Sequence, residues 1–356
     1  MLKNVVIVSA AAGRNVSSQE DIARDLNVSA SLVSKVLNDR LGTTRVAAQT
    51  VEAIRRRAVE IRYRKHGSAV ALATGRQGAV GVFIHRIGLA GSGLTEAILE
   101  GIAEGSMATG ERLVLQFFET SAQFRAWSPE VQPTLVDGII VAGKFHADLR
   151  DDFLQIQARG VRVVTVLKSP IHPTLLNIGV DEREVGRVAT AHLIERGCRQ
   201  IAHLKVLDPH LAGYWAALDA AGIRRQTRLV YDPPAPDSAY GFEVKQGQLA
   251  VAHFAAQGIP FDGLVAQSDH SAIGAIHALL AMGRRVPQDV KVIGVDDSPF
   301  CPLAAVPLSS VSVEFRKRGL AALQLLARPA TDSPAAVPQF QPVVHARESS
   351  APTDQA

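Results

Sequence analysis

The sequence has few cysteines and none of the short motifs that mark common enzymes. Only 2 of its 356 residues are cysteines, Cys198 and Cys301, and they share no spacing with other metal ligands. A reducing, cytoplasmic compartment fits this cysteine content. No glycine-rich phosphate loop of the Walker type follows a predicted strand, and no Gly-x-Ser-x-Gly sequence occurs. We therefore expect no catalytic activity, no cofactor and no bound metal ion.

Long apolar runs are also missing. No stretch has the length needed to span a membrane, so we expect no membrane partner. The first residues, MLKNVVIVSAAAG, combine a lysine, a short apolar run and small residues, and a signal peptide is therefore an alternative. Because the apolar run is short, we interpret residues 1–17 as an N-terminal extension.

Acidic residues are scarce in one region of the chain. The formal net charge is only +4, but basic residues gather between positions 35 and 76. They are Lys35, Arg40, Arg45, Arg55, Arg56, Arg57, Arg62, Arg64, Lys65 and Arg76, against Asp39, Glu52 and Glu60. This cluster indicates a polyanionic partner near the N-terminal end. For Arg55 to Arg57 alone, a solvated helix face is the alternative interpretation.

The stretch from Ser18 to Asn38, SQEDIARDLNVSASLVSKVLN, has the spacing of a helix-turn-helix. Asn27 falls at the turn, and Ser29 is expected to cap the second helix through its hydroxyl. Apolar and small residues fall where two short helices would bury a shared face: Ile22, Ala23, Leu26, Val28, Val33, Val36 and Leu37. An ordinary surface helical hairpin is the alternative.

The outer face of the second predicted helix would carry Ala30, Ser31, Ser34, Lys35 and Asn38. These side chains are short, polar or cationic, as a helix that lies in a DNA major groove requires. The spacing therefore predicts a DNA-binding head.

A third helix from about Ala48 to Ile61 would complete the small bundle, because one stripe of it is apolar. The segment that follows, from Tyr63 to Gly78, is rich in small residues and cannot build a core of its own. We interpret this segment as a linker that becomes ordered only on a partner.

From Ala79 onward, short β-branched runs alternate with amphipathic helices, beginning with AVGVFI and ending with VKVIGVDD. This alternation predicts parallel sheets that helices cover on both faces. A break near residue 170 divides the pattern into two sheets. Ligands of open parallel sheets bind beyond the carboxyl ends of the strands, so we expect a ligand in a cleft between two lobes.

In this order, the segments resemble the LacI/GalR family of bacterial transcriptional repressors. VSASLVSKVLN is similar to the family's VSxxTVSRVLN, and AVALATGR at 69–76 is similar to its AxxLATGR. The segment SDHSAIGAIHALLAMGRRVPQDVKVIGVDD resembles NDxxAxGAxxALxxxGxxVPxDVSVxGFDD. PLSSVSV and ARESS are similar to the family's PPLTTVxx and terminal VRES. The resemblance covers residues 18 to 350, nearly the whole chain.

The resemblance implies an α-helical helix-turn-helix DNA-binding head joined to an α/β, two-lobed periplasmic-binding-protein-like domain with parallel sheets flanked by helices. The expected parts are the head at 18–64, a hinge at 65–77, the effector-binding and dimerisation domain at 78–350 and a tail at 351–356. The first lobe would hold about 78–170 and 310–328, and the second about 171–309 and 338–350. The implied protein is a homodimer on double-stranded operator DNA whose affinity a small-molecule effector controls.

In the head and hinge, the resemblance assigns individual residues to DNA. Ala30 and Ser31 stand at the family's base-reading positions, and Lys35 stands where an arginine is usual. Ser29, Ser34, Asn38 and Tyr63 are expected near phosphates, which position the protein without specifying sequence. Ala69 and Leu72 match the hinge pattern, with Leu72 at the leucine that wedges into the minor groove. Packing between domains is the alternative for Leu72.

In the lobes, the resemblance assigns an effector site. Asp296 matches the family's ligand-contacting aspartate, Ser268 stands where an asparagine often contacts ligand, and Phe315 matches an aromatic that lines the cleft. The family's ligand-gripping arginine is replaced near Asp208. For Ser268 and the adjacent Asp269, capping of the following helix is the alternative.

Cationic residues follow the predicted strands of the first lobe: His85, Arg86, Lys144 and Lys168. Cations that face one cleft favour an anionic effector, such as a carboxylate or a phosphorylated compound. Solvated loop charges are the alternative, and a neutral sugar derivative stays possible.

Two other functional classes compete with a regulator. An enzyme on the same scaffold would need the catalytic motifs that the sequence lacks. A periplasmic solute-binding protein would share the two lobes, but it would need an export signal and would have no use for a helix-turn-helix. The first 76 residues therefore favour a DNA-binding regulator.

Overall fold

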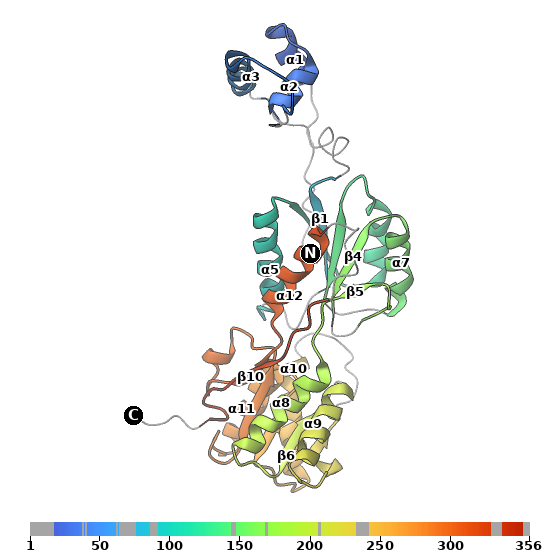
Figure 1. The fold of residues 1–356 in the computed structure, drawn as a ribbon. Coiled ribbons are helices and arrows are strands. Elements are labelled where there is room, and N and C mark those ends of the chain that lie inside the picture. Colours follow the sequence, from blue (N-terminus) through green and yellow to red (C-terminus); the bar gives the residue numbers. More distant parts are fainter. Residues whose placement is uncertain are drawn as a thin grey trace, which may run out of the picture. The chain divides into compact units, whose positions relative to one another are not determined.

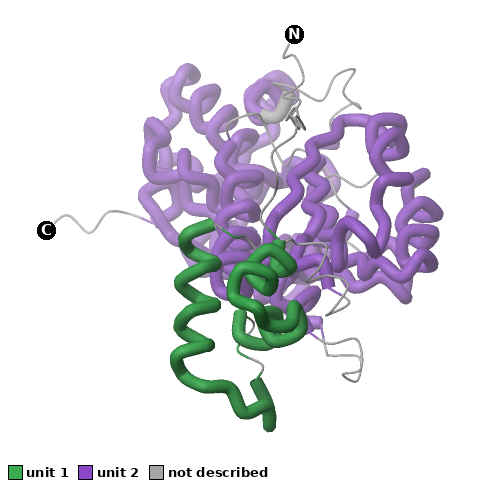
Figure 2. Tube along the Cα trace, turned by 90° about the horizontal axis from the view of Figure 1, so that it is seen from above, with its two compact units in different colours: residues 1–75 green, residues 76–356 purple. Residues whose placement is uncertain are grey.

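The computed structural model describes residues 18–37, 39, 41–61, 63, 76–85, 92–143, 147–167, 170–205, 208–232, 242–328 and 337–351. The chain divides into two compact units, residues 1–75 and residues 76–356 (Figure 2). The first is a small helical unit, and the second contains two parallel-stranded sheets flanked by helices. The predicted fold class is confirmed.

The first unit contains three helices, α1 (Gln19–Asp25), α2 (Ala30–Leu37) and α3 (Ala48–Glu60). They bury a common apolar core made of Ile22, Ala23, Val33, Val36, Ile54 and Ala58. The third helix lies where the apolar stripe of the sequence predicted it. Because each helix buries one face in this shared core, its opposite face is turned toward solvent.

Local capping explains where the first two helices begin. Ser18 and Asp21 form a reciprocal capping box: the Asp21 amide donates to the Ser18 hydroxyl at 3.1 Å, and the Ser18 amide donates to the Asp21 carboxylate at 2.9 Å. Asn27 turns the chain with a φ of +52°, a left-handed conformation that asparagine tolerates. The Leu32 amide then donates to the Ser29 hydroxyl at 3.1 Å, so the predicted cap of α2 is confirmed.

The second unit begins with a five-stranded parallel sheet in the order β2-β1-β3-β4-β5. Its strands are β1 (Ala79–His85), β2 (Arg112–Phe118), β3 (Gly138–Ala142), β4 (Arg162–Val166) and β5 (Leu176–Asn177). Helices α5 (Leu94–Thr109) and α12 (Phe315–Ala327) cover one face, and α6 (Ser121–Trp127) and α7 (Arg150–Ala158) cover the other (Figure 1). We call this sheet with its helices the first lobe.

The second lobe is built on a six-stranded sheet in the order β11-β10-β9-β8-β6-β7, parallel except for β11. Its strands are β6 (Ile201–Leu204), β7 (Val230–Tyr231), β8 (Gly263–Val265), β9 (Lys291–Val295), β10 (Ser309–Ser312) and β11 (Val343–His345). Helices α8 (Glu182–Glu195) and α9 (Asp208–Ala220) pack on one face. Helices α10 (Phe242–Ala256) and α11 (Asp269–Ala281) pack on the other.

The expected limits of the lobes need correction at two strands. Residues 171–309 were assigned to the second lobe, but β5 at Leu176–Asn177 pairs with β4 in the first sheet. Residues 310–328 were assigned to the first lobe, but β10 at Ser309–Ser312 pairs with β9 in the second sheet. Both strands lie next to points where the chain passes between the lobes. The chain therefore forms β5 before it leaves the first sheet and β10 before it leaves the second, and β11 joins the second sheet after α12.

Three helix pairs of the second unit meet backbone to backbone, and in each pair both helices carry a glycine at the contact. A Cβ atom on Gly101 of α5 would lie 1.9 Å from the Arg316 carbonyl oxygen of α12, and one on Gly319 would lie 2.3 Å from that of Ile98. Gly186 and Gly213 lie at the corresponding contact between α8 and α9, and Gly247 and Gly274 lie at the one between α10 and α11. At these positions no larger residue fits without separating the helices.

Candidate DNA-contacting and effector sites

The outward face of α2 is the candidate DNA-contacting surface. Val33 and Val36 are buried in the core of the head, so the positions between them face away from it. Ser29, Ala30, Ser31 and Lys35 are exposed, and Ser34 is half-buried. The Lys35 ammonium donates to the Thr44 hydroxyl at 3.0 Å, which holds the side chain beside the following loop. The core thus presents a face of short side chains and one cation.

The arginines of α3 do not all belong to the expected basic surface. The Arg57 guanidinium contacts the Asp25 carboxylate at 2.6 Å and that of Glu60 at 3.0 Å, so it ties α3 to the end of α1. These hydrogen bonds raise the pKa of Arg57 above its usual value. Arg55 contacts Asp39 at 2.7 Å, and Arg56 lies 3.8 Å from Glu60. Arg57 is therefore a structural residue.

Of the remaining residues predicted to contact DNA, the structure describes Tyr63 alone. Tyr63 is half-buried, packs against the core of the head and donates its amide to the Ala58 carbonyl at 2.8 Å. Asn38, Ala69 and Leu72 lie outside the described residues. For these positions, contact with DNA stays a prediction.

Removing the Lys35 charge is expected to weaken DNA binding without unfolding the head. Lys35 is exposed, and among the described residues its ammonium donates to the Thr44 hydroxyl, so Lys35→Ala costs little stability. A lost cation near phosphates lowers affinity for all duplexes alike and reduces the slope of log K against log salt by about 1. Titration of a labelled duplex at several salt concentrations measures both quantities. Arg24→Ala, an exposed cation on α1 paired with Asp21, is the matched control. A Lys35→Ala salt slope equal to the wild-type slope contradicts the prediction.

In the second unit, Asp296 ends strand β9 in a strained conformation. Its φ is +103°, and the next residue, Asp297, has a φ of +54°. Such backbone angles cost on the order of 1–3 kcal/mol in a residue with a side chain, and they gather at functional sites. The Asp297 carboxylate binds Arg347 at 2.8 Å and His345 at 3.1 Å, which holds this turn in place. The carboxylate at 296 is thereby presented at the carboxyl end of the sheet.

Phe315, the first residue of α12, packs against the apolar cores of both lobes. One turn later, the Arg318 guanidinium lies 5.4 Å from the centre of the Phe315 ring. Arg318 is only 2% exposed, and burial lowers its pKa to about 10, which leaves it charged at neutral pH. Glu182 and Asp296 of the second lobe act on this charge in the opposite direction. Asp296 and Phe315 thus belong to one junction between the lobes.

Ser268 is confirmed as a helix cap. The Ser271 amide donates to its hydroxyl at 3.2 Å, and the side chain is almost fully buried. Its neighbour Asp269 accepts the Ser298 amide at 2.6 Å and the Ser310 hydroxyl at 2.5 Å. Burial raises the pKa of Asp269 to about 6, because the hydrogen bonds compensate only part of the desolvation. Capping therefore uses the Ser268 hydroxyl, and its contact with an effector stays a prediction.

Of the four cationic residues expected at the strand ends of the first lobe, the structure describes one, His85. His85 ends β1, is buried, and its Nε2 lies 3.3 Å from the Glu119 carbonyl oxygen. Arg86, Lys144 and Lys168 lie outside the described residues. The prediction of an anionic effector accordingly stays a prediction.

Asp208, where the family's ligand-gripping arginine is replaced, is the first residue of helix α9. Its exposed carboxylate contacts Lys205 at 3.1 Å, and its contact with an effector stays a prediction. His210 instead lies in the buried interior, and its Nε2 contacts the Glu182 carboxylate at 2.5 Å. Sequence reasoning missed this pair, since its members are 28 positions apart and follow no motif.

Among the residues that the structure describes, no group of three or more histidine, cysteine, aspartate or glutamate side chains has an arrangement that could hold a metal ion. Within the same residues, no helix combines the length and apolar character required to cross a membrane.

Comparisons with known proteins agree with this geometry. A family model described as a periplasmic binding protein-like domain matches residues 190–350. The chain is 26% identical over 320 residues to the HTH-type transcriptional regulator RegA of Clostridium saccharobutylicum, covering 87% of this chain and 91% of that protein. It is 28% identical over 359 residues to the HTH-type transcriptional regulator MalR of Streptomyces coelicolor, covering 93% and 96%.

Solved structures give the same result. A complex of the transcriptional regulator CelR with cellobiose superposes with a TM-score of 0.63 at 25% identity, covering 94% of this chain and 99% of that one. The Lac repressor dimer bound to operator and the anti-inducer ONPF superposes with a TM-score of 0.73 over the same shares. At 21% identity, the second likeness supports the fold alone.

Proposed function

Because the chain belongs to the LacI/GalR family of transcriptional regulators, we propose that the outward face of α2 binds operator DNA and that an effector at the Asp296–Phe315 junction controls this binding. The protein is a DNA-binding regulator and not an enzyme. It acts as a homodimer, so two heads read two half-sites of a near-palindromic operator. Its location, in this proposal, is the cytoplasm, where the operator is.

The exposed face of α2 is the observation that carries the DNA-binding assignment. Ser29, Ala30, Ser31 and Lys35 are exposed on a helix whose opposite face is locked in a core. Small side chains allow close approach of the backbone to the base edges, and lysine contributes a point charge without the bidentate geometry of arginine. We therefore expect much of the affinity to come from phosphate contacts and less from direct base contacts.

The effector is proposed to be a sugar derivative. In this proposal it also carries an acidic group, which the cationic residues of the first lobe would favour. Asp296 supplies a carboxylate that accepts hydrogen bonds from hydroxyl groups, and Phe315 supplies an apolar surface. CelR, a relative of similar length, is seen with cellobiose. His85, Arg86, Lys144 and Lys168 would favour a carboxylate or phosphate on the same molecule.

The DNA-binding proposal is tested with the full-length protein and two labelled duplexes. One duplex comes from the region upstream of its own gene, and the other is a scrambled sequence of the same composition. Specific binding is typically about 10³-fold or more tighter than non-specific binding at moderate salt. Equal affinity for the two duplexes would overturn the proposal.

Asp296→Asn is expected to abolish control by the effector. Cellobiose, ribose, glucuronate and glucose 6-phosphate are added in turn to the full-length protein on its upstream duplex. We expect at least one compound to change the duplex Kd by about 5- to 150-fold, the usual range of allosteric coupling. In Asp296→Asn this change is lost, so the compound leaves the duplex Kd within about 2-fold, since an amide replaces the charged acceptor. Binding to DNA alone stays within about 2-fold.

The matched control is Asp219→Asn, an exposed carboxylate on α9 that is paired with Arg225. Its response to each compound is expected to equal that of the wild type. A full response in Asp296→Asn contradicts the assignment of Asp296.

A further inference from the structure

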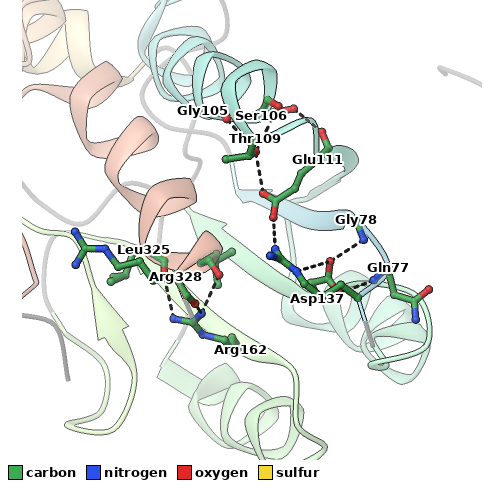
Figure 3. Close-up of polar contacts among 12 residues, drawn as sticks. Gln77, Gly78, Gly105, Ser106, Thr109, Glu111, Asp137, Arg162, Leu325 and Arg328 are labelled. Carbon is green, nitrogen blue, oxygen red and sulfur yellow. Dashed lines mark hydrogen bonds and ion pairs between the residues drawn. The ribbon is translucent and has the colours of Figure 1, made fainter. Parts of the chain in front are cut away.

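Helix α12 connects two distant parts of the second unit. It spans Phe315–Ala327, and 13 residues at 1.5 Å per residue make it about 20 Å long. Its first residue, Phe315, packs against the cores of both lobes. Its last turn lies against the ends of β3 and β4, on the side where the chain enters the second unit after residue 75 (Figure 3).

The beginning of α12 is attached to the crossing between the lobes. The buried Arg318 side chain donates from Nε to the Ile178 carbonyl at 3.2 Å, and from one terminal nitrogen to the carbonyls of Leu167 and Ile178 at 3.2 and 3.1 Å. Leu167 follows β4, and Ile178 follows β5 at the point where the chain leaves the first sheet toward the second lobe. A movement of the lobes therefore acts directly on this turn of α12.

The end of α12 is held by a second arginine. Arg162, the first residue of β4, donates from one nitrogen to the Leu325 carbonyl and from another to the Leu326 carbonyl, both at 2.8 Å, and also contacts the Arg328 carbonyl (Figure 3). The last carbonyls of a helix have no partner within the helix. One planar guanidinium with several donors satisfies them together and fixes the helix end to the sheet.

We call Arg162, with the α12 carbonyls that it holds, the clamp. The chain that enters the second unit after residue 75 is anchored beside the clamp (Figure 3). The Asp137 carboxylate accepts the amides of Gln77 and Gly78, each at 2.7 Å (Figure 3). Arg76 contacts the buried Glu111 carboxylate at 2.7 Å. We call Asp137 and Glu111, with the residues they hold, the linker anchor.

The anchor and the clamp are in direct contact through Gly138. This residue follows Asp137, and a Cβ atom on it would lie 2.8 Å from Leu326 and 3.1 Å from the Arg162 carbonyl oxygen. Burial, and to a smaller extent the like charge of Arg76, lower the pKa of Arg162. A displacement of the end of α12 is therefore transmitted to the residues that hold the linker.

We propose that α12 is a rigid link that couples the junction at Phe315 and Arg318 to the linker anchor, with Arg162 as the positioning residue at its far end. The proposal rests on the proposed function, because it describes how occupancy of the effector site reaches the DNA-binding head. Coupling between two sites is reciprocal. DNA bound to the head must therefore alter the effector end of α12 as well.

Hydrogen exchange of the full-length protein, with and without the upstream duplex, tests this coupling. In the wild type, duplex is expected to change the exchange rates of the amides at 313–320 by about 5-fold or more. In Arg162→Gln this change is lost, while the change at 76–85 near the linker persists. Arg162→Lys gives the same loss, since one ammonium cannot bridge three carbonyls.

The matched control is Arg159→Gln. Arg159 also donates to a main-chain carbonyl, that of Ser128 at 2.9 Å, but it contacts neither α12 nor the anchor. Thermal unfolding of each variant separates lost coupling from lost fold. An unchanged response at 313–320 in both Arg162 variants, or no response in the wild type, overturns the proposal. A scrambled duplex also loads the head through phosphates, so coupling is measurable even if specific operator binding, and with it the proposed function, fails.

Discussion

Gly213→Ala is expected to destabilise the protein by about 2–4 kcal/mol, because the added methyl group has no space between α8 and α9. A Cβ atom at this position would lie 1.9 Å from the Arg183 carbonyl oxygen and 2.6 Å from the Arg187 amide nitrogen. Both atoms belong to the backbone of α8, so no side-chain rotation relieves the overlap. The helices must separate, and the apolar contacts along both of them weaken.

Helix propensity alone would change the stability of Gly213→Ala in the opposite direction, so the sign of the measured change distinguishes the two effects. Alanine is favoured over glycine inside a helix by about 1 kcal/mol, so an unobstructed substitution would stabilise α9. Urea unfolding, read as the midpoint and slope, measures the difference. Gly105→Ala is the matched control and is expected to cost less, because its Cβ would meet the Leu323 side chain, at 2.7 Å from Cδ2, and not a main-chain atom. A Gly213→Ala variant as stable as wild type would contradict the close contact seen here.

His203→Phe is expected to make the protein much more resistant to acid. His203 is fully buried on β6, stacks on Tyr214 with ring centres 4.8 Å apart, and neither ring nitrogen has a hydrogen-bond partner among the described residues. Burial, helped by the charge of His210, lowers the pKa of His203 to about 3. The folded protein therefore keeps this ring neutral while the unfolded chain protonates it at its ordinary pKa of 6.5.

The sign follows from proton linkage. Below pH 6.5 the unfolded state binds more protons at this position, so stability falls as the pH decreases toward 3. A single group of this kind contributes roughly 1 kcal/mol per pH unit. Phenylalanine preserves the stacking on Tyr214 and cannot be protonated, so the variant is expected to lose this decline.

Asp269 acts in the opposite direction and must be separated from His203. Its raised pKa of about 6 means that the folded state holds a proton that the unfolded state releases near 3.8. Its contribution therefore decreases as the pH rises from about 4 to 6 and is level above that range. The difference between the stability curves of wild type and His203→Phe, measured from pH 4 to 8, cancels the Asp269 contribution.

Tyr214→Phe is the control for the acid experiment. It removes the hydrogen bond from the Tyr214 hydroxyl to the Ile201 carbonyl, at 2.8 Å, from the same cluster. Its unfolding free energy is expected to be lower than that of the wild type by the same amount at every pH below neutrality, so the two stability curves run parallel. A His203→Phe curve with the wild-type slope would show that the buried ring is protonated in the folded state.

The elements that depend on local signals could be predicted from sequence. Ser18, Asn27 and Ser29 mark the helix ends of the head through caps and a turn that involve residues three or four positions apart. The alternation of strands and helices predicted the two parallel sheets, because both faces of each sheet are buried. Strands β5 and β10 were misplaced, since only pairing across the fold determines to which sheet a short strand belongs.

The contacts that organise the candidate sites could not be predicted in the same way. Arg57 belongs to a run that indicated a polyanion, yet it contacts Asp25 at a separation of 32 positions. Arg318 and Arg162 reach carbonyls 140 and 163 positions away. A carbonyl acceptor leaves no mark in a sequence, because every residue has one. The buried histidines and these arginines therefore emerge only from the three-dimensional arrangement.

The paired glycines have a mechanical consequence. A contact made by main-chain atoms contains no side chains that could exchange rotamers, so α5 with α12, α8 with α9 and α10 with α11 resist sliding along one another. Relative motion of the lobes is then confined to the crossing segments, and it takes the form of a hinge rotation in which each helix pair travels as a solid body.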